Sequence, residues 1–540
     1  MNGAQLFVAC LQAQGVEWIS TLCGNGLNGI LAACRQAGVR RVDTRNEQTA
    51  AYMAEAWGRL SGRVGVCAVS SGVAHANAMT GVVNACFDGA PMLLVTGAGP
   101  RRTAGRGHFQ DLDQVALAAP VCKYACTLDQ AERIPEYVYQ AFAAALSARP
   151  GPVHLTFPMD VQEALVEGVE PAPAVLRQAG APAPAAAVAR AVDLLARAQR
   201  PVLVCGSGVF YSGGEEAAMA LAAAYGIPLV VPIWDRGCVG RPCGEYLGVV
   251  GAASGGPRLL EDADLVLLAG AEVDYRVGYL QSPPLGGDLR VVRIQPDPAR
   301  AARCRVDVDL LADPGTALAQ VQEACTGRQI RGFEAWLAEA QQRQARFAEG
   351  LRVAPAQGDG RLPGPEVMAV LEEVLPPEAV LIVDGGNVGQ WFHQTLGRRR
   401  YPGHWLTCGA SGVVGNGIGA AMAARTGFAH RPVVLLSGDG AATFNLPDLE
   451  RAAAQGLPFV MLIADDEAWG IVEVGHRRQY GEPLNSALGP IDFAALAQSL
   501  GALGTRVSSR GELERALRQG MGERLPAVIH VPVTGGFPGG

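Results

Sequence analysis

The sequence lacks an excess of positive charge, a long apolar run and closely paired cysteines. Its 44 Lys and Arg residues are outnumbered by 51 Asp and Glu, which gives a net charge of −7, and its longest basic run is Arg398–Arg400. Nucleic acids and anionic membranes are therefore not expected partners. Charged or polar residues interrupt every apolar stretch before the roughly 18 residues that a transmembrane helix needs.

The thirteen cysteines are scattered, and no two of them are separated by only two residues. This spacing does not indicate a structural zinc site, and an odd number of cysteines in apolar surroundings is typical of a reducing compartment. Met1–Gln5 also lack the basic residues that open a secretory signal. We therefore expect a cytoplasmic protein without structural zinc and without a membrane-spanning segment.

What the sequence does contain is an alternation of short apolar runs with longer helical patterns. The residues are 49% hydrophobic and 18% charged, which predicts well-packed cores and excludes a disordered chain. Continuous apolar runs are typical of parallel strands that are buried on both faces. The fold class predicted is α/β, with strands at Val64–Val69, Met92–Thr96, Pro201–Cys205, Leu265–Ala269, Val380–Val383, Val433–Ser437 and Phe459–Ala464.

Two changes in composition divide the 540 residues into three units. Pro171–Ala187 is dense in Pro and Ala, which is typical of an extended linker, and Gly358–Pro365 is rich in Gly and Pro. At roughly 150 residues per domain, the length favours three or four domains. We predict three doubly wound parallel-sheet domains, at residues 1–168, 189–350 and 351–540, with a linker at 169–188.

Acidic residues follow two neighbouring strands of the third unit. Gly438-Asp439-Gly440 comes after one buried run, and Asp465-Asp466 comes after the next, with a helix expected from Leu446-Pro447 and capped by Asn445. Ligands bind at the carboxyl edge of parallel sheets, where both acidic groups would lie. Glycines allow a close approach to a diphosphate, and carboxylates suit Mg²⁺. Without the second group, Gly-Asp-Gly would most often be only a turn.

These residues resemble the signature of the thiamine-diphosphate enzymes, in which Gly-Asp-Gly is followed after roughly 25 residues by two Asn. Asp466 lies 27 residues after Asp439, and Asp465-Asp466 stands where the family has the Asn pair. The resemblance implies that Asp439, the Asp466 side chain and the Ala468 carbonyl bind Mg²⁺. It also implies that cofactor-binding residues include Gly438, Gly440, Ala441, Ala442, Trp469 and Gly470.

Two further segments of the third unit are similar to the same family. Asp384–Trp391 resembles the Asp-Val-Gly-Gln-His loop that contacts the diphosphate, with Trp in place of the His. Gly409–Ala421 resembles a Gly-rich stretch whose bulky apolar residue, here Val414, holds the cofactor in a V shape, although such a segment is also a generic turn before a helix. The resemblance adds cofactor-binding candidates at Asn387, Val388, Gly389, Gln390, Gly412, Val413 and Val414.

In the first unit, Val42–Arg59 is similar to the family's segment with the catalytic Glu, and Glu47 occupies that position. The Glu would hydrogen-bond N1′ of the cofactor's pyrimidine and pass a proton, which requires a carboxyl group. On the residues alone, Glu47 is also suited to the first turn of a helix, where it favours the helix dipole. His108–Asp113 resembles the Phe-Gln-Glu element of acetolactate synthases, which makes Gln110 a candidate donor to an intermediate's oxygen.

Two other loops of the first unit are expected to face the substrate. Val69–Asn77 resembles the family's Thr-Ser-Gly-Pro-Gly-Ala-Thr-Asn loop, and Thr21–Gly26 stands at the family's first active-site loop. Substrate-loop candidates are Cys23, Gly24, Asn25, Ser71 and His75. Packing is the commoner role both for a cysteine without a His partner and for a loop histidine.

The resemblance implies a thiamine-diphosphate- and Mg²⁺-dependent carbon–carbon lyase or carboligase of the acetolactate synthase and benzaldehyde lyase type. Its substrates would be small 2-oxoacids, aldehydes or acyloins, and a homodimer or homotetramer is expected. An acyloin or 2-hydroxyacyl-CoA lyase is an alternative, and a cofactor-binding pseudo-enzyme or regulatory subunit is a non-enzymatic one. Some relatives bind FAD or ADP in the central domain. Cys205-Gly206-Ser207-Gly208, Val266–Gly270 and Val292–Pro296 suit a Rossmann-like domain, but they do not establish either ligand, and we expect a structural domain.

Overall fold

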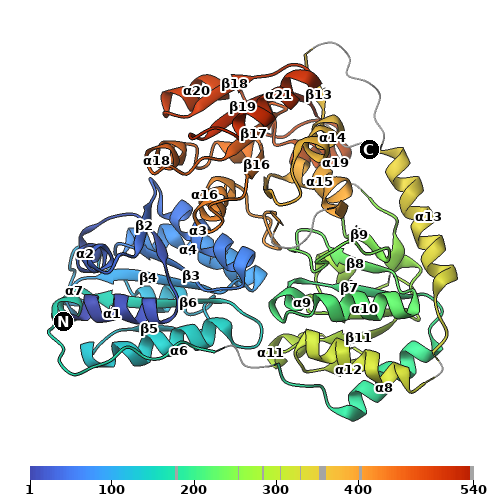
Figure 1. Cartoon of the computed structure of the whole chain (residues 1–540), viewed down its shortest axis with the longest axis horizontal. Helices are drawn as coiled ribbons and strands as arrows, with labels where there is room; N and C mark the ends of the chain where they lie inside the picture. Colours follow the sequence, from blue (N-terminus) through green and yellow to red (C-terminus); the bar gives the residue numbers. More distant parts are fainter. Residues whose placement is uncertain are drawn as a thin grey trace.

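The computed structural model describes residues 1–176, 180–252, 255–282, 285–304, 306–328, 330–351, 360–399 and 404–535. Within these ranges, three α/β units lie around a central gap, with the first and central units side by side and the third above both (Figure 1). Each unit is built on its own parallel sheet, as the apolar runs predicted. Residues 177–179 of the predicted linker, 358–359 of the predicted boundary and Arg400 lie outside the described residues.

The N-terminal domain has strand order β2-β1-β3-β4-β6-β5. Its strands are buried along most of their length, and helices cover both faces of the sheet. The strands are β1 (Trp18–Thr21), β2 (Arg40–Asp43), β3 (Gly65–Val69), β4 (Met92–Ala98), β5 (Ala125–Thr127) and β6 (Pro152–Pro158). The helices are α1 (Gly3–Ala13), α2 (Asn28–Ala37), α3 (Glu47–Ser61), α4 (Val73–Asp88), α5 (Gln114–Ala118), α6 (Ile134–Leu146) and α7 (Met159–Glu163).

The central domain has strand order β12-β11-β10-β7-β8-β9. Its first helix begins at Ala185, so the last residues of the predicted linker 169–188 are helical and contribute Ala187 and Val188 to the core. The strands are β7 (Pro201–Cys205), β8 (Leu229–Pro232), β9 (Tyr246–Val250), β10 (Leu265–Ala269), β11 (Arg290–Ile294) and β12 (Val308–Leu310). The helices are α8 (Ala185–Arg197), α9 (Ser207–Tyr211), α10 (Glu215–Tyr225), α11 (Pro298–Ala301) and α12 (Pro314–Thr326).

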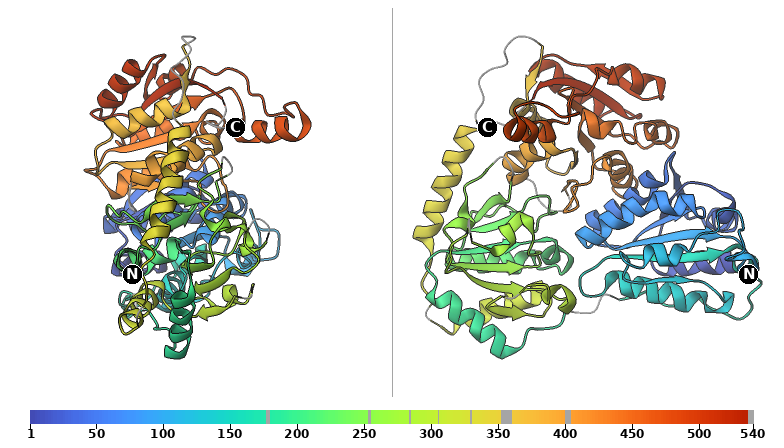
Figure 2. Two further views of the ribbon diagram at one scale, coloured as in Figure 1. Left: turned by 90° about the vertical axis from the view of Figure 1, so that its right-hand side faces the viewer. Right: turned by 180° about the vertical axis from the view of Figure 1, so that it is seen from behind.

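A long helix, α13 (Glu334–Gly350), runs along the edge of the molecule from the central to the C-terminal domain (Figure 2). The C-terminal sheet has the order β13-β19-β17-β16-β14-β15, with β18 also paired to β19. Its strands are β13 (Leu362–Pro363), β14 (Val380–Asp384), β15 (Trp405–Leu406), β16 (Val433–Gly438), β17 (Val460–Asp465), β18 (Leu503–Arg506) and β19 (Ala527–Thr534). Its helices are α14 (Gly364–Val374), α15 (Gly386–Gln394), α16 (Gly417–Gly427), α17 (Asp439–Ala442), α18 (Asp448–Ala454), α19 (Gly470–Tyr480), α20 (Phe493–Ser499) and α21 (Arg510–Gly520).

The helix predicted after the Gly-Asp-Gly turn is present, but the prediction of its cap was wrong. The short helix α17 follows β16 at once, and α18 begins only at Asp448, so Asn445 is not its cap. The Asn445 side chain is buried, and its Nδ2 donates to the carbonyl of Gly415 at 2.7 Å. A long-range hydrogen bond therefore replaces the local capping bond that the sequence favoured.

The N-terminal and C-terminal domains of one chain share a core where α3 packs on α16. Gly419 permits this close approach, because a Cβ there would lie 2.9 Å from the carbonyl oxygen of Thr49. Thr49 in turn donates its hydroxyl to Asp448 at 2.6 Å.

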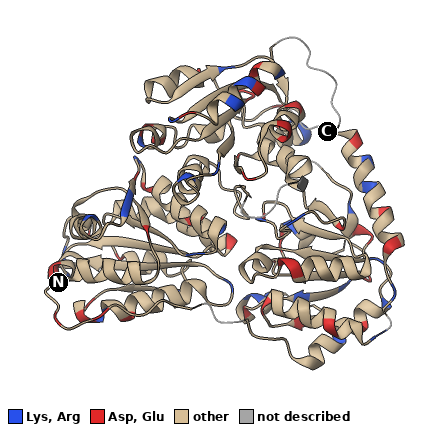
Figure 3. Ribbon diagram, viewed as in Figure 1, with Lys and Arg blue, Asp and Glu red and all other residues tan. Residues whose placement is uncertain are grey.

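Basic and acidic residues are interspersed over all three domains (Figure 3). None of the helices in the described ranges is both long and apolar enough to cross a membrane.

Candidate active site

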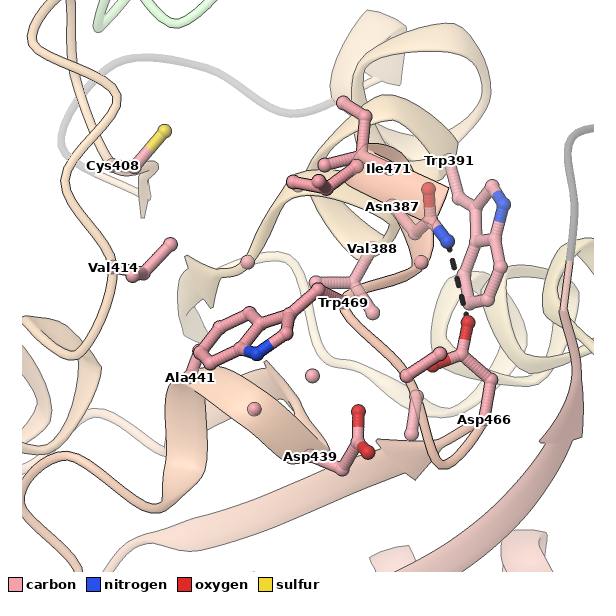
Figure 4. A pocket seen from close by; sticks show the side chains of 18 of the residues that line it. Asn387, Val388, Trp391, Cys408, Val414, Asp439, Ala441, Asp466, Trp469 and Ile471 are labelled. Atoms are coloured by element: carbon pink, nitrogen blue, oxygen red, sulfur yellow. Dashed lines mark hydrogen bonds between the residues drawn. The ribbon is translucent and has the colours of Figure 1, made fainter. Parts of the chain in front are cut away.

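A cavity of about 430 Å³ lies at the carboxyl ends of β14, β16 and β17. It is lined almost entirely by the C-terminal domain, whose parallel strands deliver their polar turns to one edge of the sheet. Twelve of the sixteen predicted cofactor residues line it: Asn387, Val388, Gly412, Val414, Gly438, Asp439, Gly440, Ala441, Asp466, Ala468, Trp469 and Gly470. Figure 4 shows Asp439 and Asp466 on one side of Trp469, with Cys408 and Val414 at the end away from Asp466.

The other four predicted residues do not line this cavity, although each is next to residues that do. Gly389 packs on Trp234, because a Cβ there would lie 2.3 Å from the indole ring. Gln390 is 1% exposed on the same helix, and Ala442 belongs to the domain core. Val413 packs against Trp234 and Cys408. A sequence motif predicts which segment lies at the cavity. The local backbone geometry then decides which of its side chains face the ligand.

Asp439 and Asp466 are the two carboxylates of the cavity. Burial, together with the negative charges of Asp466 and Asp465, raises the pKa of Asp439 to about 7. Burial and the charge of Asp465 also raise the pKa of Asp466, although Nδ2 of Asn387 donates to its Oδ2 at 3.3 Å. A bound cation would offset the burial and the negative charges that raise both pKa values.

The carboxylate of Asp465, next in the chain to Asp466, does not line the cavity and has other hydrogen-bond partners. Its Oδ2 lies 2.7 Å from Nε2 of His530, and its Oδ1 accepts a hydrogen bond from the backbone N–H of Glu467 at 3.0 Å. Burial raises the pKa of Asp465, but these hydrogen bonds outweigh it and leave the pKa below its ordinary value. Asp465 thus fixes the turn in which Glu467 has a φ of +54°.

Glycines give the turns around Asp466 their shape. A Cβ at Gly470 would lie 2.1 Å from Nδ2 of Asn387 and 2.4 Å from Asp466 Oδ2. A Cβ at Gly440 would lie 2.7 Å from the ring of Trp469. The first turn of α15, which has no side-chain cap, opens at the same edge and leaves backbone N–H groups for an anion. The donor set therefore suits a diphosphate beside a hard cation.

A second polar cluster lies at the carboxyl edge of the N-terminal sheet. Glu47 is the first residue of α3, and its Oε2 accepts a hydrogen bond from Nδ2 of Asn77 at 3.1 Å. The hydroxyl of Ser71 donates to Oε1 of Gln110 at 2.9 Å, and Gln110 has a φ of +57°. Gly24 approaches the same loop, since a Cβ there would lie 2.5 Å from Ser70.

Three family models match the chain, one for each domain. The N-terminal TPP-binding domain of thiamine pyrophosphate enzymes matches residues 1–117, the central domain 188–321 and the C-terminal TPP-binding domain 384–531. The chain belongs to the thiamine pyrophosphate enzyme family. Both polar clusters lie within the two cofactor-binding domains, and the resemblance inferred from the sequence is confirmed.

The similarity to individual members of the family extends over nearly the whole chain. A probable acetolactate synthase of Mycobacterium bovis is 31% identical over 536 residues, which cover 98% of this chain and 95% of that protein. The acetolactate synthase large subunit of Parasynechococcus marenigrum is 30% identical, with coverage of 99% and 88%. The 2-hydroxyacyl-CoA lyase 2 of Caenorhabditis elegans is 29% identical, with coverage of 98% and 89%. This chain is an acetolactate-synthase-like thiamine pyrophosphate enzyme.

Among the predicted substrate-loop residues of this thiamine pyrophosphate enzyme, His75 lies in the interior of the domain and not on an exposed loop. Its ring is fully buried and lies 3.0 Å from the hydroxyl of Thr96, which also lies 3.0 Å from His154. The imidazole therefore belongs to the interior of the domain. Ser71 bonds to Gln110 and so lies at the N-terminal cluster, and Cys23 is exposed next to Gly24, which packs on Ser70. Asn25 begins a short 3₁₀ turn beside Gly24.

Several residues that line the cavity were not predicted from the sequence. Trp234 comes from the central domain and has a φ of +66°, with its backbone N–H donating to Nε2 of His393 at 3.2 Å. Its only sequence signal was a large aromatic residue after an apolar strand. The remaining missed residues are Gly385, Gly386, Trp391, Cys408, Ala464, Ile471, Val472 and Val533. Trp391 had a signal, because it stands where the family has a histidine.

The small crevice at the carboxyl ends of β7, β10 and β11 in the central domain does not fit a dinucleotide. The backbone N–H of Gly208, the second residue of α9, donates to the carbonyl of Gly270 at 2.9 Å, and the N–H of Ser207, the first, donates to Asp235 at 2.8 Å. A cavity of only about 20 Å³ remains there, about enough for a water molecule. Glu272, just after β10, pairs with Arg149 of the N-terminal domain and with Arg300. The groups that would bind a diphosphate already have partners in the chain.

Proposed function

We propose that this chain is a thiamine-diphosphate- and Mg²⁺-dependent enzyme that forms or cleaves a carbon–carbon bond beside a carbonyl group. The substrates would be 2-oxoacids, aldehydes or acyloins, as in the acetolactate synthase group. The observation that carries the proposal is the pair of polar clusters, one on each cofactor-binding domain: an acid- and glycine-lined cavity on one, and Glu47 with Gln110 on the other.

In the C-terminal cavity, Asp439, Asp466 and the carbonyl of Ala468 would hold Mg²⁺. The described residues contain no group of three or more His, Cys, Asp and Glu side chains arranged to bind a metal. Two carboxylates and a carbonyl leave coordination positions for phosphate oxygens and water, which is how Mg²⁺ commonly binds beside phosphates. When bound, thiamine diphosphate supplies the electron sink for the bond that is made or broken.

In the N-terminal cluster, Glu47 would hold a proton at N1′ of the cofactor's pyrimidine. Asn77 donates to one carboxylate oxygen and orients the group, while the other oxygen stays available. Ser71 donates to Oε1 of Gln110, and the Gln110 amide N–H groups, which donate to no partner in the described ranges, would donate to a substrate oxygen. The left-handed backbone at Gln110 fits a functional position, since strained residues concentrate at such sites.

The complete site would need two copies of the chain. Among the described residues, those lining the C-terminal cavity include none from the N-terminal domain, so Glu47 and Gln110 of the same chain do not reach it. Val73 and Phe109, beside the N-terminal cluster, are 65% and 69% exposed, which suits burial against a second copy. We propose a homodimer as the minimal unit and a homotetramer as its further assembly. All thirteen cysteines are unpaired, which supports a cytoplasmic location.

Hydrogen–deuterium exchange at C2 of the bound cofactor, followed by NMR, tests the enzyme. With saturating thiamine diphosphate and Mg²⁺, we expect exchange much faster than in free cofactor. Glu47→Gln should abolish the acceleration, whereas Glu136→Gln, at an exposed pair with Arg133, should retain it. Exchange at the free-cofactor rate in saturated wild-type protein would favour a binding or regulatory protein instead.

A substrate panel then separates the lyase and carboligase alternatives. Pyruvate consumption with formation of an acyloin would indicate a carboligase of the acetolactate synthase type. Cleavage of benzoin would indicate an acyloin lyase. Cleavage of a 2-hydroxyacyl-CoA would favour the second candidate, which the similarity to 2-hydroxyacyl-CoA lyase 2 supports.

A further inference from the structure

The loop that carries Val414 is held from outside its own domain. This loop, residues 407–416, joins β15 to α16, and Cys408, Gly412 and Val414 on it line the cavity. The hydroxyl of Thr407 donates to the carbonyl of Trp234 in the central domain at 3.1 Å. Its far end is held within the C-terminal domain, where the N–H of Gly417 donates to Asp384 at 2.7 Å.

The N-terminal domain makes three more hydrogen bonds to the same loop. Nη1 of Arg59, on α3, donates to the carbonyl of Thr407 at 2.8 Å. Oδ1 of Asp88, the last residue of α4, accepts from the N–H of Ala410 at 2.8 Å. The hydroxyl of Ser411 donates to the amide oxygen of Asn84, one turn earlier on α4. All three side chains from the N-terminal domain are buried.

Asp88 and Arg59 also form a buried ion pair, in which Nη1 of Arg59 lies 3.5 Å from Oδ2 of Asp88. Burial disfavours the charged guanidinium, but Asp88 and Glu55 outweigh this effect and keep the pKa of Arg59 above its ordinary value. Removing one member of such a pair leaves an uncompensated buried charge, which is strongly unfavourable. The loop is therefore attached to a fixed charge pair and not to mobile surface groups.

The shape of the loop matches this attachment at Gly409. Its φ is +87°, and a Cβ at this position would lie 1.9 Å from Oδ2 of Asp88. Only glycine lets the backbone pass the carboxylate this closely in this conformation. Gly409 therefore lies between Cys408 and Gly412, which both line the cavity.

We propose that Asp88 and Arg59 are positioning residues that set the loop against the ring end of thiamine diphosphate, so that the N-terminal domain controls cofactor affinity in the C-terminal domain of its own chain. This inference rests on the proposed cofactor site. Asp439 and Asp466, at the proposed diphosphate end, are not part of the loop, and Val414 lies at the end of the cavity away from Asp466 (Figure 4). Displacing the loop should therefore weaken binding of the thiamine rings and spare the diphosphate.

The test compares the dissociation constants of thiamine diphosphate and inorganic diphosphate, both with Mg²⁺, measured by quenching of the cavity tryptophans in the full-length protein. Loss of the buried acceptor in Asp88→Ala should raise the dissociation constant of thiamine diphosphate about tenfold. Inorganic diphosphate should bind as to wild type. Asp88→Asn, which keeps the acceptor for the Ala410 N–H, should recover part of the loss. Asp160→Asn, at an exposed pair with Arg101, should change neither constant.

Unchanged thiamine diphosphate affinity in Asp88→Ala, or an equal loss for both ligands, would overturn the proposal, because the second result indicates only a general disturbance of the fold. Gly409→Ala provides an independent variant if Asp88→Ala does not fold, and it should also weaken thiamine diphosphate selectively. If wild-type protein binds neither ligand, the cofactor site itself is wrong, and that outcome is distinct from failure of the positioning role.

Discussion

Nε2 of His530 lies 2.7 Å from the carboxylate of Asp465, and the two residues stand on the adjacent parallel strands β19 and β17. Both side chains are buried. Asp465 and Asp466 are neighbours in the chain, yet the first bonds to His530 and the second lines the cavity beside Asn387. Of the two acids that stand in place of the family's Asn pair, only Asp466 lines the cavity, whereas Asp465 acts on the proposed metal site through its charge.

Substituting each acid by Asn should separate these roles. Asp465→Asn breaks a buried charged hydrogen bond and should lower the free energy of unfolding by about 1–3 kcal/mol, with a smaller effect on the Mg²⁺ requirement than Asp466→Asn has. Asp466→Asn removes a ligand charge and should raise the Mg²⁺ concentration needed for cofactor binding about tenfold. Urea unfolding and Mg²⁺ titration of cofactor binding measure the two effects. An equal change in the Mg²⁺ requirement for both variants would mean that Asp465 also binds the metal.

The buried His75 should make stability depend on pH. Burial lowers its pKa from 6.5 to about 4, so between these values the unfolded chain binds a proton that the folded chain does not. The contribution is complete above pH 6.5 and is lost as pH falls towards 4, with a size of about 3 kcal/mol. His75→Asn should flatten the change in urea midpoint between pH 6.5 and 4.5, while the exposed-site variant His430→Asn should follow wild type. Parallel curves for both variants would contradict this.

We expect no flavin in the central domain. The backbone N–H groups of Ser207 and Gly208 already donate hydrogen bonds within the chain. Glu272 forms ion pairs with Arg149 and Arg300 beside the same crevice. A dinucleotide would have to break these contacts before binding. The purified protein should show no visible flavin absorbance, and calorimetric titration with FAD or ADP should show no binding. Saturable micromolar binding of either ligand would show that the crevice opens.

Much of the fold follows from the sequence because buried parallel strands are continuous apolar runs. The runs at Pro201–Cys205 and Leu265–Ala269 match β7 and β10 residue for residue. The acidic turns were equally clear, since Asp439 and Asp466 each follow such a run. Topology then places both at one edge of the sheet.

Side-chain direction and long-range contacts could not be predicted in the same way. His75 and Ser71 lie in one loop motif, yet one faces the interior and the other bonds to Gln110. Asn445 has the local pattern of a helix cap but bonds to Gly415, 30 residues away. Asp88 and Ala410 are separated by 322 residues, so no local pattern connects them. These contacts depend on how the three domains pack.

The sharing of one active site between two copies of the chain is tested most directly by mixed dimers. Glu47→Gln should inactivate the N-terminal half-site and Asp439→Asn the C-terminal half-site, so each variant alone should be inactive. Unfolding and refolding the two together should restore about a quarter of wild-type activity, because half of the random dimers are mixed and each contains one intact site. Recovery at that level would support the account. No recovery, in dimers shown to be mixed, would contradict it and place the complete site within a single chain.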